Sequence, residues 1–101
     1  MASSFRNYKK TGITGETTVF TGAASTETTL IGCTIANTSA NDAAVDVKIG
    51  GAYMLKGAPV FTGGAMTPIG GEQKVVMMAG EDLKVTSTET VDVIVSVLEK
   101  V

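Results

Sequence analysis

The sequence predicts an all-β protein, an antiparallel β-sandwich or small barrel of about seven or eight short strands with an extended N-terminal arm. Threonine and valine, whose branched β-carbons favour strands, are abundant. No segment sustains a helical apolar periodicity over about 11 residues. Short apolar runs alternate instead with turn residues, about every 8–12 positions. The 101 residues are enough for one domain.

The expected elements follow from these runs. Residues 1–14 are predicted to form an N-terminal arm or a first strand, and residues 15–101 a single sandwich domain. Gly50-Gly51 predicts a tight hairpin turn, since glycine tolerates positive φ. The Gly- and Pro-rich stretch 58–72 predicts a long connection, and residues 73–98 a meander. The predicted strands are 16–21, 27–37, 44–50, 52–57, 60–61, 73–78, 83–87 and 91–99, and residues 4–14 are either the arm or a first strand.

The last predicted strand, 91–99, is apolar on both faces. Successive side chains of a strand point to opposite faces, so the alternate valines from Val91 to Val97 share one face. Ile94 and Leu98 lie on the other face. An antiparallel sheet over a single core normally turns one polar face to water. The pattern therefore predicts that something covers the second face of this strand.

The run Val75-Val76-Met77-Met78 raises the same question, because adjacent apolar residues must face opposite sides of one strand. Two explanations stay open. Either the 58–72 connection folds over the outside of the sandwich, or another subunit covers this face. Only 18% of the residues are charged, which favours a subunit.

Charge is distributed unevenly along the chain. Residues 1–10 hold three positive charges and no acid, so the rest of the chain carries −5 against −2 overall. This segment is either an arm that docks on an acidic surface or a solvated edge strand whose lysines prevent pairing with other chains. The overall negative charge argues against broad nucleic-acid binding. Phe5 and Tyr8 interleave with these charges but are too few for a base-stacking platform.

The sequence lacks the residues of most catalytic and metal sites. There is no histidine, which excludes Ser-His-Asp and Cys-His catalysis and any histidine-ligated metal. Cys33 is the one cysteine, so no disulfide forms within the chain, and we expect it to be a small buried hydrophobic residue. No phosphate-binding glycine motif occurs. We therefore expect no enzyme activity, no cofactor and no metal.

The remaining candidate groups have structural explanations. Glu81-Asp82 lie at a predicted turn, where neighbouring side chains diverge, and Asp42 and Asp46 lack the spacing of a calcium loop. Three aromatic residues, Tyr53, Phe61 and Phe20, are weighed as the lining of a sugar site. The N-terminus lacks the apolar core of a signal peptide, and no apolar run reaches the roughly 20 residues that span a bilayer. We therefore expect a product of the cytoplasm that does not bind membranes.

Six stretches of the chain, none of them a catalytic motif, carry a likeness to known proteins. They are SFRNYKKTGITGETTVFT (4–21), IG-x-x-x-ANT (31–38), VDV (45–47), YMLKGAPV (53–60), GGEQKVVM-x-AG-x-x-LKVTS (70–87) and DVIVSVLE (92–99). In these stretches, nearly the whole chain resembles a group of small structural proteins from the particles of tailed bacteriophages, frequent among marine phages of the cyanophage type.

The resemblance implies a non-enzymatic building block of the particle, assembled in the host cytoplasm. We expect a capsid decoration or cement subunit, with a tail, neck, baseplate or fibre component as the alternative. A host-surface carbohydrate-binding module is the alternative of another class. The expected partners are other virion proteins (the major capsid protein or tail proteins) and further copies of this chain. The residues expected to contact them are Phe5, Arg6, Tyr8, Lys9, Lys10, Met77, Ile94 and Leu98.

Overall fold

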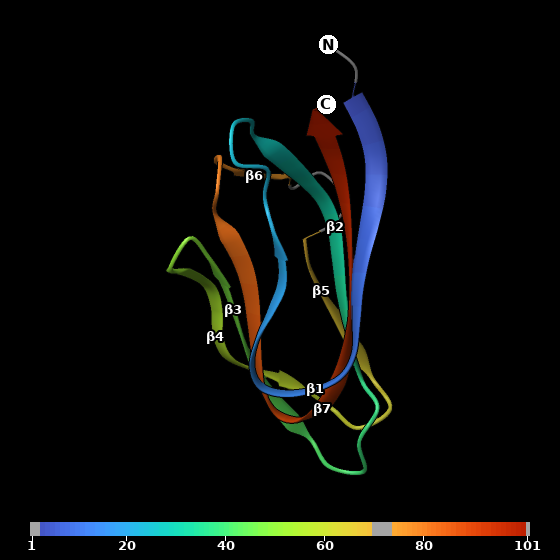
Figure 1. The fold of residues 1–101 in the computed structure, drawn as a ribbon. Helices are drawn as coiled ribbons and strands as arrows, with labels where there is room; N and C mark the ends of the chain where they lie inside the picture. Colours follow the sequence, from blue (N-terminus) through green and yellow to red (C-terminus); the bar gives the residue numbers. More distant parts are fainter. Residues whose placement is uncertain (1–2, 70–73, 101) are drawn as a thin grey trace.

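Seven antiparallel strands make up the fold in the computed structural model, which describes residues 3–69 and 74–100 (Figure 1). No described residue lies in a helix, which confirms the all-β class. The first and last strands are each 19 residues long, although short strands were expected. The strands are β1 (Ser3–Thr21), β2 (Thr28–Asn37), β3 (Ala43–Ile49), β4 (Ala52–Val60), β5 (Ala65–Ile69), β6 (Val75–Met77) and β7 (Asp82–Lys100).

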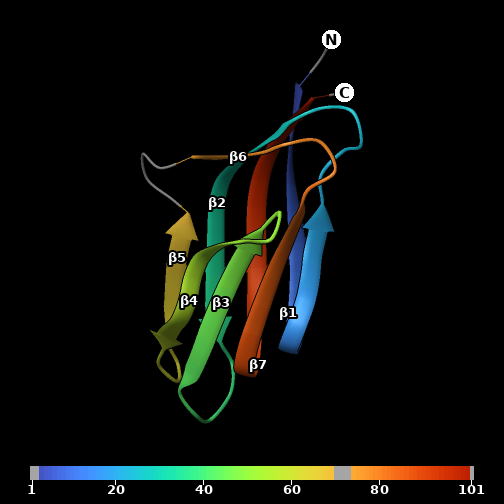
Figure 2. The same ribbon diagram turned by 90° about the vertical axis from the view of Figure 1, so that its left-hand side faces the viewer.

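One long ribbon, made of β1 and β7, organises the whole sheet. The two strands pair from Ser3 with Lys100 to Thr21 with Asp82. Half-way along, at residues 11–15 of β1 and 88–90 of β7, the ribbon bends and folds the sheet over into two layers (Figures 1 and 2). Register shifts interrupt the pairing there, and bulges of this kind let a strand turn a corner.

Each layer takes one end of the ribbon and adds its own strands. The β2 layer consists of residues 3–10 of β1, residues 91–100 of β7, and strands β2, β5 and β6. The β3 layer consists of residues 15–21 of β1, residues 82–87 of β7, and strands β3 and β4. The architecture is therefore a sandwich made from a single curled sheet.

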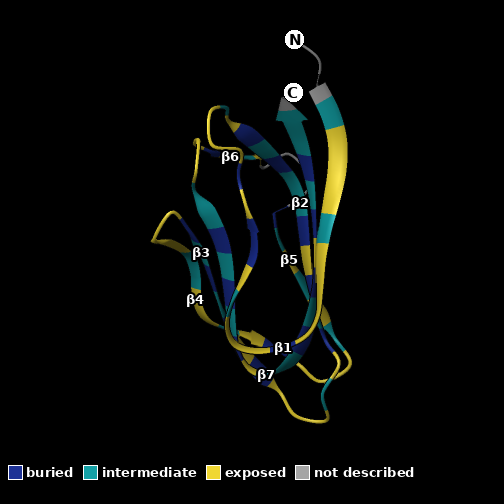
Figure 3. Cartoon of the chain, in the orientation of Figure 1, coloured by how far each residue is buried: buried dark blue, intermediate teal, exposed yellow. Residues whose placement is uncertain are grey.

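The core lies between the layers and follows the alternation of the strands. All four alternate valines from Val91 to Val97 are fully buried, as predicted (Figure 3). Leu30 and Ile35 of β2 and Val45 and Val47 of β3 are fully buried in the same hydrophobic cluster. Each fully buried side chain of this kind contributes about 1.5–3 kcal/mol relative to an exposed one.

Two contacts close the open sides of the curled sheet. On the β1 side, the rings of Tyr8 and Phe20 stack face to face, with centroids 4.6 Å apart. They belong to the two ends of the same strand, one in each layer. On the opposite side, the buried amide nitrogen of Asn37 donates hydrogen bonds to the carbonyls of Val60 (2.9 Å) and Asn41 (2.8 Å).

Several predicted elements differ from the structure because glycine and threonine positions that look like turns are bulges or corners. Residues 4–14 and 16–21 belong to one strand, β1, which pairs with β7 from Ser3 onward, so the first-strand alternative describes this segment. The runs 83–87 and 91–99 likewise belong to one strand, β7. The predicted meander is also wrong, because β6 pairs with β2.

The predicted hairpin at Gly50-Gly51 is confirmed. It joins β3 to β4, and both glycines have positive φ, 56° and 85°. A Cβ atom on Gly50 would lie 2.2 Å from Oε2 of Glu81, whereas one on Gly51 would meet nothing within 4 Å. The turn therefore needs glycine twice, and a side chain at Gly50 would also displace the flexible side chain of Glu81, which accepts a hydrogen bond from the Met78 amide.

Cys33 is fully buried beside the last strand, as expected. Loss of hydration raises the pKa of its thiol to about 12. The thiol therefore stays protonated at neutral pH and is a poor nucleophile.

Replacing Gly50 by alanine is predicted to destabilise the fold by about 1–2 kcal/mol, through positive φ and the clash with Glu81. Gly51→Ala is the matched control, because Gly51 also has a positive φ but has open space where a Cβ atom would lie. It should lower the free energy of unfolding by less. Urea unfolding measures both. Adding Glu81→Ala to Gly50→Ala should recover part of the loss. Equal effects of the two glycine variants would contradict this account.

Tyr8 makes the stability depend on pH in the alkaline range. Its hydroxyl donates a hydrogen bond to the Glu99 carboxylate, and this bond, followed by burial, raises its pKa above the ordinary 10.0. The folded state thus holds this proton more tightly, a contribution fully present below pH 10 and lost as the pH rises through the raised pKa. We predict that Tyr8→Phe lowers the free energy of unfolding at neutral pH. The deficit should shrink above about pH 10 in urea unfolding. A deficit that does not change with pH would refute the assignment.

Candidate docking surface

The outer face of the β2 layer carries an apolar row that crosses four strands. Phe5 of β1 pairs with Leu98 of β7, Leu98 with Thr29 of β2, and Thr29 with Val76 of β6. Residues paired in this way point to the same side of a sheet. The row runs on the side opposite the buried valines, so it faces away from the core.

A second apolar position on this face comes from Ile94, which pairs with Lys9 on one side and Thr34 on the other. Ile31 lies between the two rows, where a register shift separates the pairs of Leu30 and Gly32. We call the five outward residues Phe5, Ile31, Val76, Ile94 and Leu98 the apolar face. Phe5 is 76% exposed, Val76 53% and Ile94 47%, while Ile31 and Leu98 are half-buried.

A shallow hollow lies in the middle of the apolar face. Its lining includes Asn7 and Ser96, which pair with each other and supply little bulk. Phe5 and Ile31 stand beside this pair, and the residues lining the hollow are Phe5, Arg6, Asn7, Ile31, Ser96 and Val97. The surface therefore offers raised apolar side chains around a small depression, a shape that suits a protruding side chain of a partner.

The outer face of the β3 layer has the opposite chemistry. One row pairs Glu16 with Thr86 and Thr86 with Asp46, and the next pairs Thr18 with Lys84 and Lys84 with Lys48. We call these six residues the polar face. It is what an antiparallel sheet that faces water normally shows. The two outer faces of one sheet thus differ: the β2 layer exposes Phe5, Val76 and Ile94 among its polar residues. The polar face carries charged residues and threonines, with Tyr53 exposed beside Lys48.

Positive charge borders the apolar face along β1. Lys9 and Lys10 are exposed and make no ion pair with any described residue. Arg6 is exposed as well, and its Nε lies 3.2 Å from Oε1 of Glu99. Lys9 pairs with Ile94 and therefore points to the same side as the apolar face. Arg6 and Lys10 pair with the buried Val97 and Val93, so they point to the other side of the sheet at its edge.

The structure brings together most of the residues predicted to contact partners. Phe5, Ile94 and Leu98 lie on the apolar face, and Arg6, Lys9 and Lys10 lie on β1 beside it. Tyr8 turns inward onto Phe20. Met77 is fully buried in the core, so its side chain does not belong to this surface, and Val76 faces outward in its place.

Ile31 and Val76 were not singled out from the sequence, although a signal for Val76 was present. Simple alternation predicts Ile31 on the same face as the buried Cys33 and Ile35, and the register shift between Leu30 and Gly32 turns it outward instead. Val76 follows Val75 directly, and adjacent residues of a regular strand point to opposite faces. Deciding which member of a pair faces inward requires the register, and a shift of one residue reverses the assignment.

One of the two explanations for the second apolar face was that the 58–72 connection folds over the outside of the sandwich. The described part of this connection does not do so. Within the stretch 58–72, β4 extends to Val60 and residues 65–69 form β5. β5 pairs with β2 edge to edge, from Cys33 with Ile69 to Ala36 with Ala65, and so widens the sheet instead of covering it. Residues 70–73 of this stretch lie outside the described residues. Coverage by another subunit stays a prediction.

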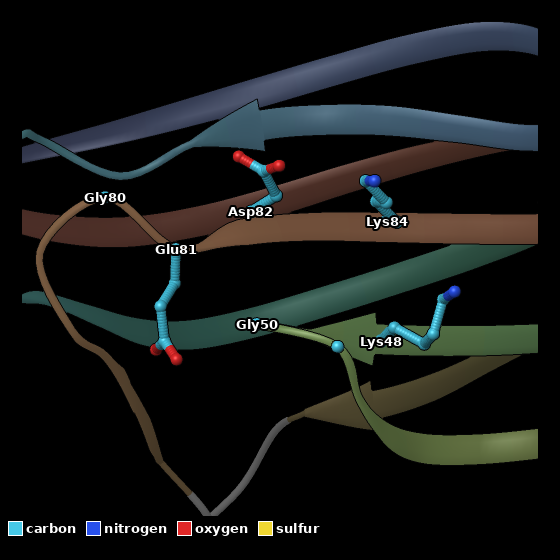
Figure 4. A pocket seen from close by; sticks show the side chains of 7 residues that line it. Lys48, Gly50, Gly80, Glu81, Asp82 and Lys84 are labelled. Carbon is cyan, nitrogen blue, oxygen red and sulfur yellow. The ribbon is translucent and has the colours of Figure 1, made fainter.

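A pocket lined by glycines and charged residues lies at one end of the β3 layer, but its two acids are already engaged in hydrogen bonds. Glu81 accepts a hydrogen bond from the Met78 amide (2.8 Å) and Asp82 one from the Thr21 hydroxyl (2.7 Å). The two acids point in opposite directions (Figure 4), so they do not form a catalytic pair. The residues lining the pocket are Lys48, Gly50, Gly51, Gly80, Glu81, Asp82 and Lys84.

The ion pair on the polar face is similarly structural. Nζ of Lys48 lies 2.9 Å from Oε2 of Glu16, which lowers the pKa of this carboxyl and raises that of the lysine. Asp42 and Asp46 accept hydrogen bonds from the amides of Thr62 (3.0 Å) and Gly57 (2.7 Å). Among the described residues, no group of three or more potential ligands is arranged to hold a metal ion.

The three aromatic residues weighed as a sugar site do not come together. Phe20 is buried against Tyr8. Tyr53 and Phe61 are exposed near opposite ends of β4. Tyr53 lies between two lysines, with the ammonium of Lys48 5.4 Å and that of Lys56 4.7 Å from its ring centre.

Comparison with known proteins gives no relative from which to transfer a function. No family model, no curated protein and no solved structure matches the chain. The described residues contain no helix that is long and apolar enough to cross a membrane. Function must therefore be argued from the surface itself.

The apolar face is predicted to contribute little to the stability of the free subunit. Ile94→Thr should change the free energy of unfolding by less than about 0.5 kcal/mol. Val95→Thr, one residue along the same strand, should cost about 1–3 kcal/mol, because it buries a hydroxyl in the core. Urea unfolding compares the two, and Ile94→Thr should also reduce binding of a hydrophobic dye. A similar loss of stability in both variants would show that Ile94 is already covered within the fold.

Proposed function

We propose that this protein is a non-enzymatic structural subunit of a bacteriophage particle, and more specifically a capsid decoration or cement subunit. The observation that carries the proposal is the contrast between the apolar face of the β2 layer and the polar face of the β3 layer. An isolated subunit gains nothing from the apolar face. A subunit that docks through the β2 layer buries that face and keeps the polar face in water.

The energetic scale suits such a role. Covering on the order of 300 Å² of apolar surface would contribute about 7 kcal/mol, much of it offset by the loss of rotational and translational freedom. A single contact of this size is weak. When a subunit also contacts other copies on a lattice, its overall affinity for the particle exceeds the affinity of any single contact. The resemblance to phage particle proteins along the sequence supports the same role.

The proposed partner is the major capsid protein or a tail protein, with further copies of this chain packed beside it. A tail, neck, baseplate or fibre component would use the same apolar face and differs only in location and copy number. The alternative of a carbohydrate-binding module has weaker support, because the aromatic residues are dispersed and Tyr53 stands alone between its lysines. Saturable binding on a glycan array that Tyr53→Ala abolishes would favour that alternative.

Incorporation into particles tests the proposal. Phage carrying the gene should yield purified particles that contain the protein, measured by quantitative mass spectrometry. A high copy number indicates the shell, and a low one the tail. The double variant Val76→Asp/Ile94→Asp, which charges the apolar face, should reduce incorporation by at least about tenfold.

The matched control places the same charges on the other layer. Thr18→Asp/Thr86→Asp changes two outward residues of the polar face and should leave incorporation near the wild-type level. Circular dichroism and urea unfolding verify that both variants are folded. Absence of the wild-type protein from the particles would refute the proposal. Normal incorporation of the Val76/Ile94 variant would show that the apolar face is not the docking surface.

A further inference from the structure

The curled sheet leaves several strand edges, and they differ in how well they can accept another strand. β4 and β5 lie at the two ends of the strand order, β6 lies beside β2, and β1 pairs with β7 alone. An unpaired edge presents backbone N–H and C=O groups that form a ready template for a further strand. Natural proteins block such edges with prolines, bulges or short strands.

Three of these edges are blocked in that way. β4 contains Pro59, and two register shifts interrupt its pairing with β3. β5 has five residues, one of them Pro68, and its pairing with β2 is also shifted. β6 has only three residues. None of them offers a regular run of free backbone groups.

The N-terminal part of β1 is different. From Ser3 with Lys100 to Lys10 with Val93, its residues pair with β7 in an unbroken register, without proline or bulge. No other described strand pairs with the outer edge of this segment. Residues 3–10 thus form a long, regular edge whose outward backbone groups have no partner strand within the described fold.

The charges on this edge select the partner. Residues 3–10 contain Arg6, Lys9 and Lys10 and no acid. If the same segment of a second copy were added, it would bring three further positive charges within about 5 Å, and facing like charges destabilise a strand pair. Lys9 and Lys10 point to opposite faces of the sheet, since they pair with Ile94 and Val93. Carboxylates on either face of an added acidic strand would therefore lie opposite one unpaired lysine.

We propose that the free edge of β1 over residues 4–10 accepts an extended, acidic segment of a neighbouring virion polypeptide as an additional antiparallel or parallel strand. This inference rests on the proposed function, since it specifies the chemistry of the partner. Backbone hydrogen bonds fix the added strand, and its side chains meet Phe5, Asn7 and Lys9 on the outer face. A residue opposite Phe5 extends the apolar row, so the added strand and the apolar face form one continuous docking surface.

A peptide experiment tests the proposal on the isolated protein. The probe is a short peptide that alternates glutamate with valine and threonine. Two control peptides replace either the valines by prolines, which keeps the charge but prevents strand formation, or the glutamates by lysines. Titration followed by NMR should show saturable binding of the glutamate peptide. Alternate amides of residues 4–10 should then become protected from hydrogen exchange.

Variants of the protein distinguish an effect of charge at the β1 edge from an effect of the net charge of the protein. Lys9→Glu should weaken binding of the glutamate peptide by about tenfold or more. Lys56→Glu, the same change on the blocked β4 edge, should have little effect. Equal binding of the proline peptide would overturn the proposal, because it would reduce the effect to charge attraction. Absence of protection in residues 4–10 would overturn it as well.

The outcomes also distinguish this proposal from the proposed function. If the protein is present in phage particles but the glutamate peptide does not protect β1, strand addition is wrong and the structural role stands. If the peptide adds to β1 but the protein is absent from particles, the edge is a real binding site and the virion role is wrong.

Discussion

The pairing of β1 with β7 is the constraint on which the rest of the structure depends. It joins residues from opposite ends of the sequence, from Ser3 with Lys100 onward, and both strands pass through both layers. Because the ribbon bends in the middle, one sheet provides two facing surfaces, and the alternate valines of β7 fill the space between them. The stack of Tyr8 on Phe20 exists only because the two ends of β1 face each other. Every other strand attaches to this ribbon directly, or through β2 or β3.

The same ribbon gives the molecule two unequal outer faces. At one end its outward residues are Glu16, Thr18, Lys84 and Thr86, and at the other they include Phe5, Ile94 and Leu98. A strand that needed only its own core would carry the first kind of residue throughout. The difference is a property of the free subunit, and under the proposed function the β2 layer docks while the β3 layer faces solvent. The open edge of β1 borders the docking layer, so an added strand and a packed face would serve the same interface.

Local patterns in the sequence predicted much of the interior. Strict alternation identified the buried valines, and the glycine pair identified the β3–β4 hairpin. The continuity of β1 and β7 was not predictable, because Gly12 and Gly15 look like turn residues whether they end a strand or bend it. Nor was the pairing of β6 with β2, which depends on long-range register. Met77 was placed on the surface for the same reason: in a run of four apolar residues, a shift of one position exchanges the inner and outer faces. The apolar character of the second face was visible in the sequence, but its extension to Ile31 and Val76 required the structure.

A cryo-EM map of the intact phage particle at side-chain resolution tests the central claim most directly, because it shows what lies against each face. The account predicts density of another subunit packed on Phe5, Val76 and Ile94, with Thr18 and Thr86 facing solvent. A map in which the β2 layer faces solvent and the β3 layer makes the contact would contradict it.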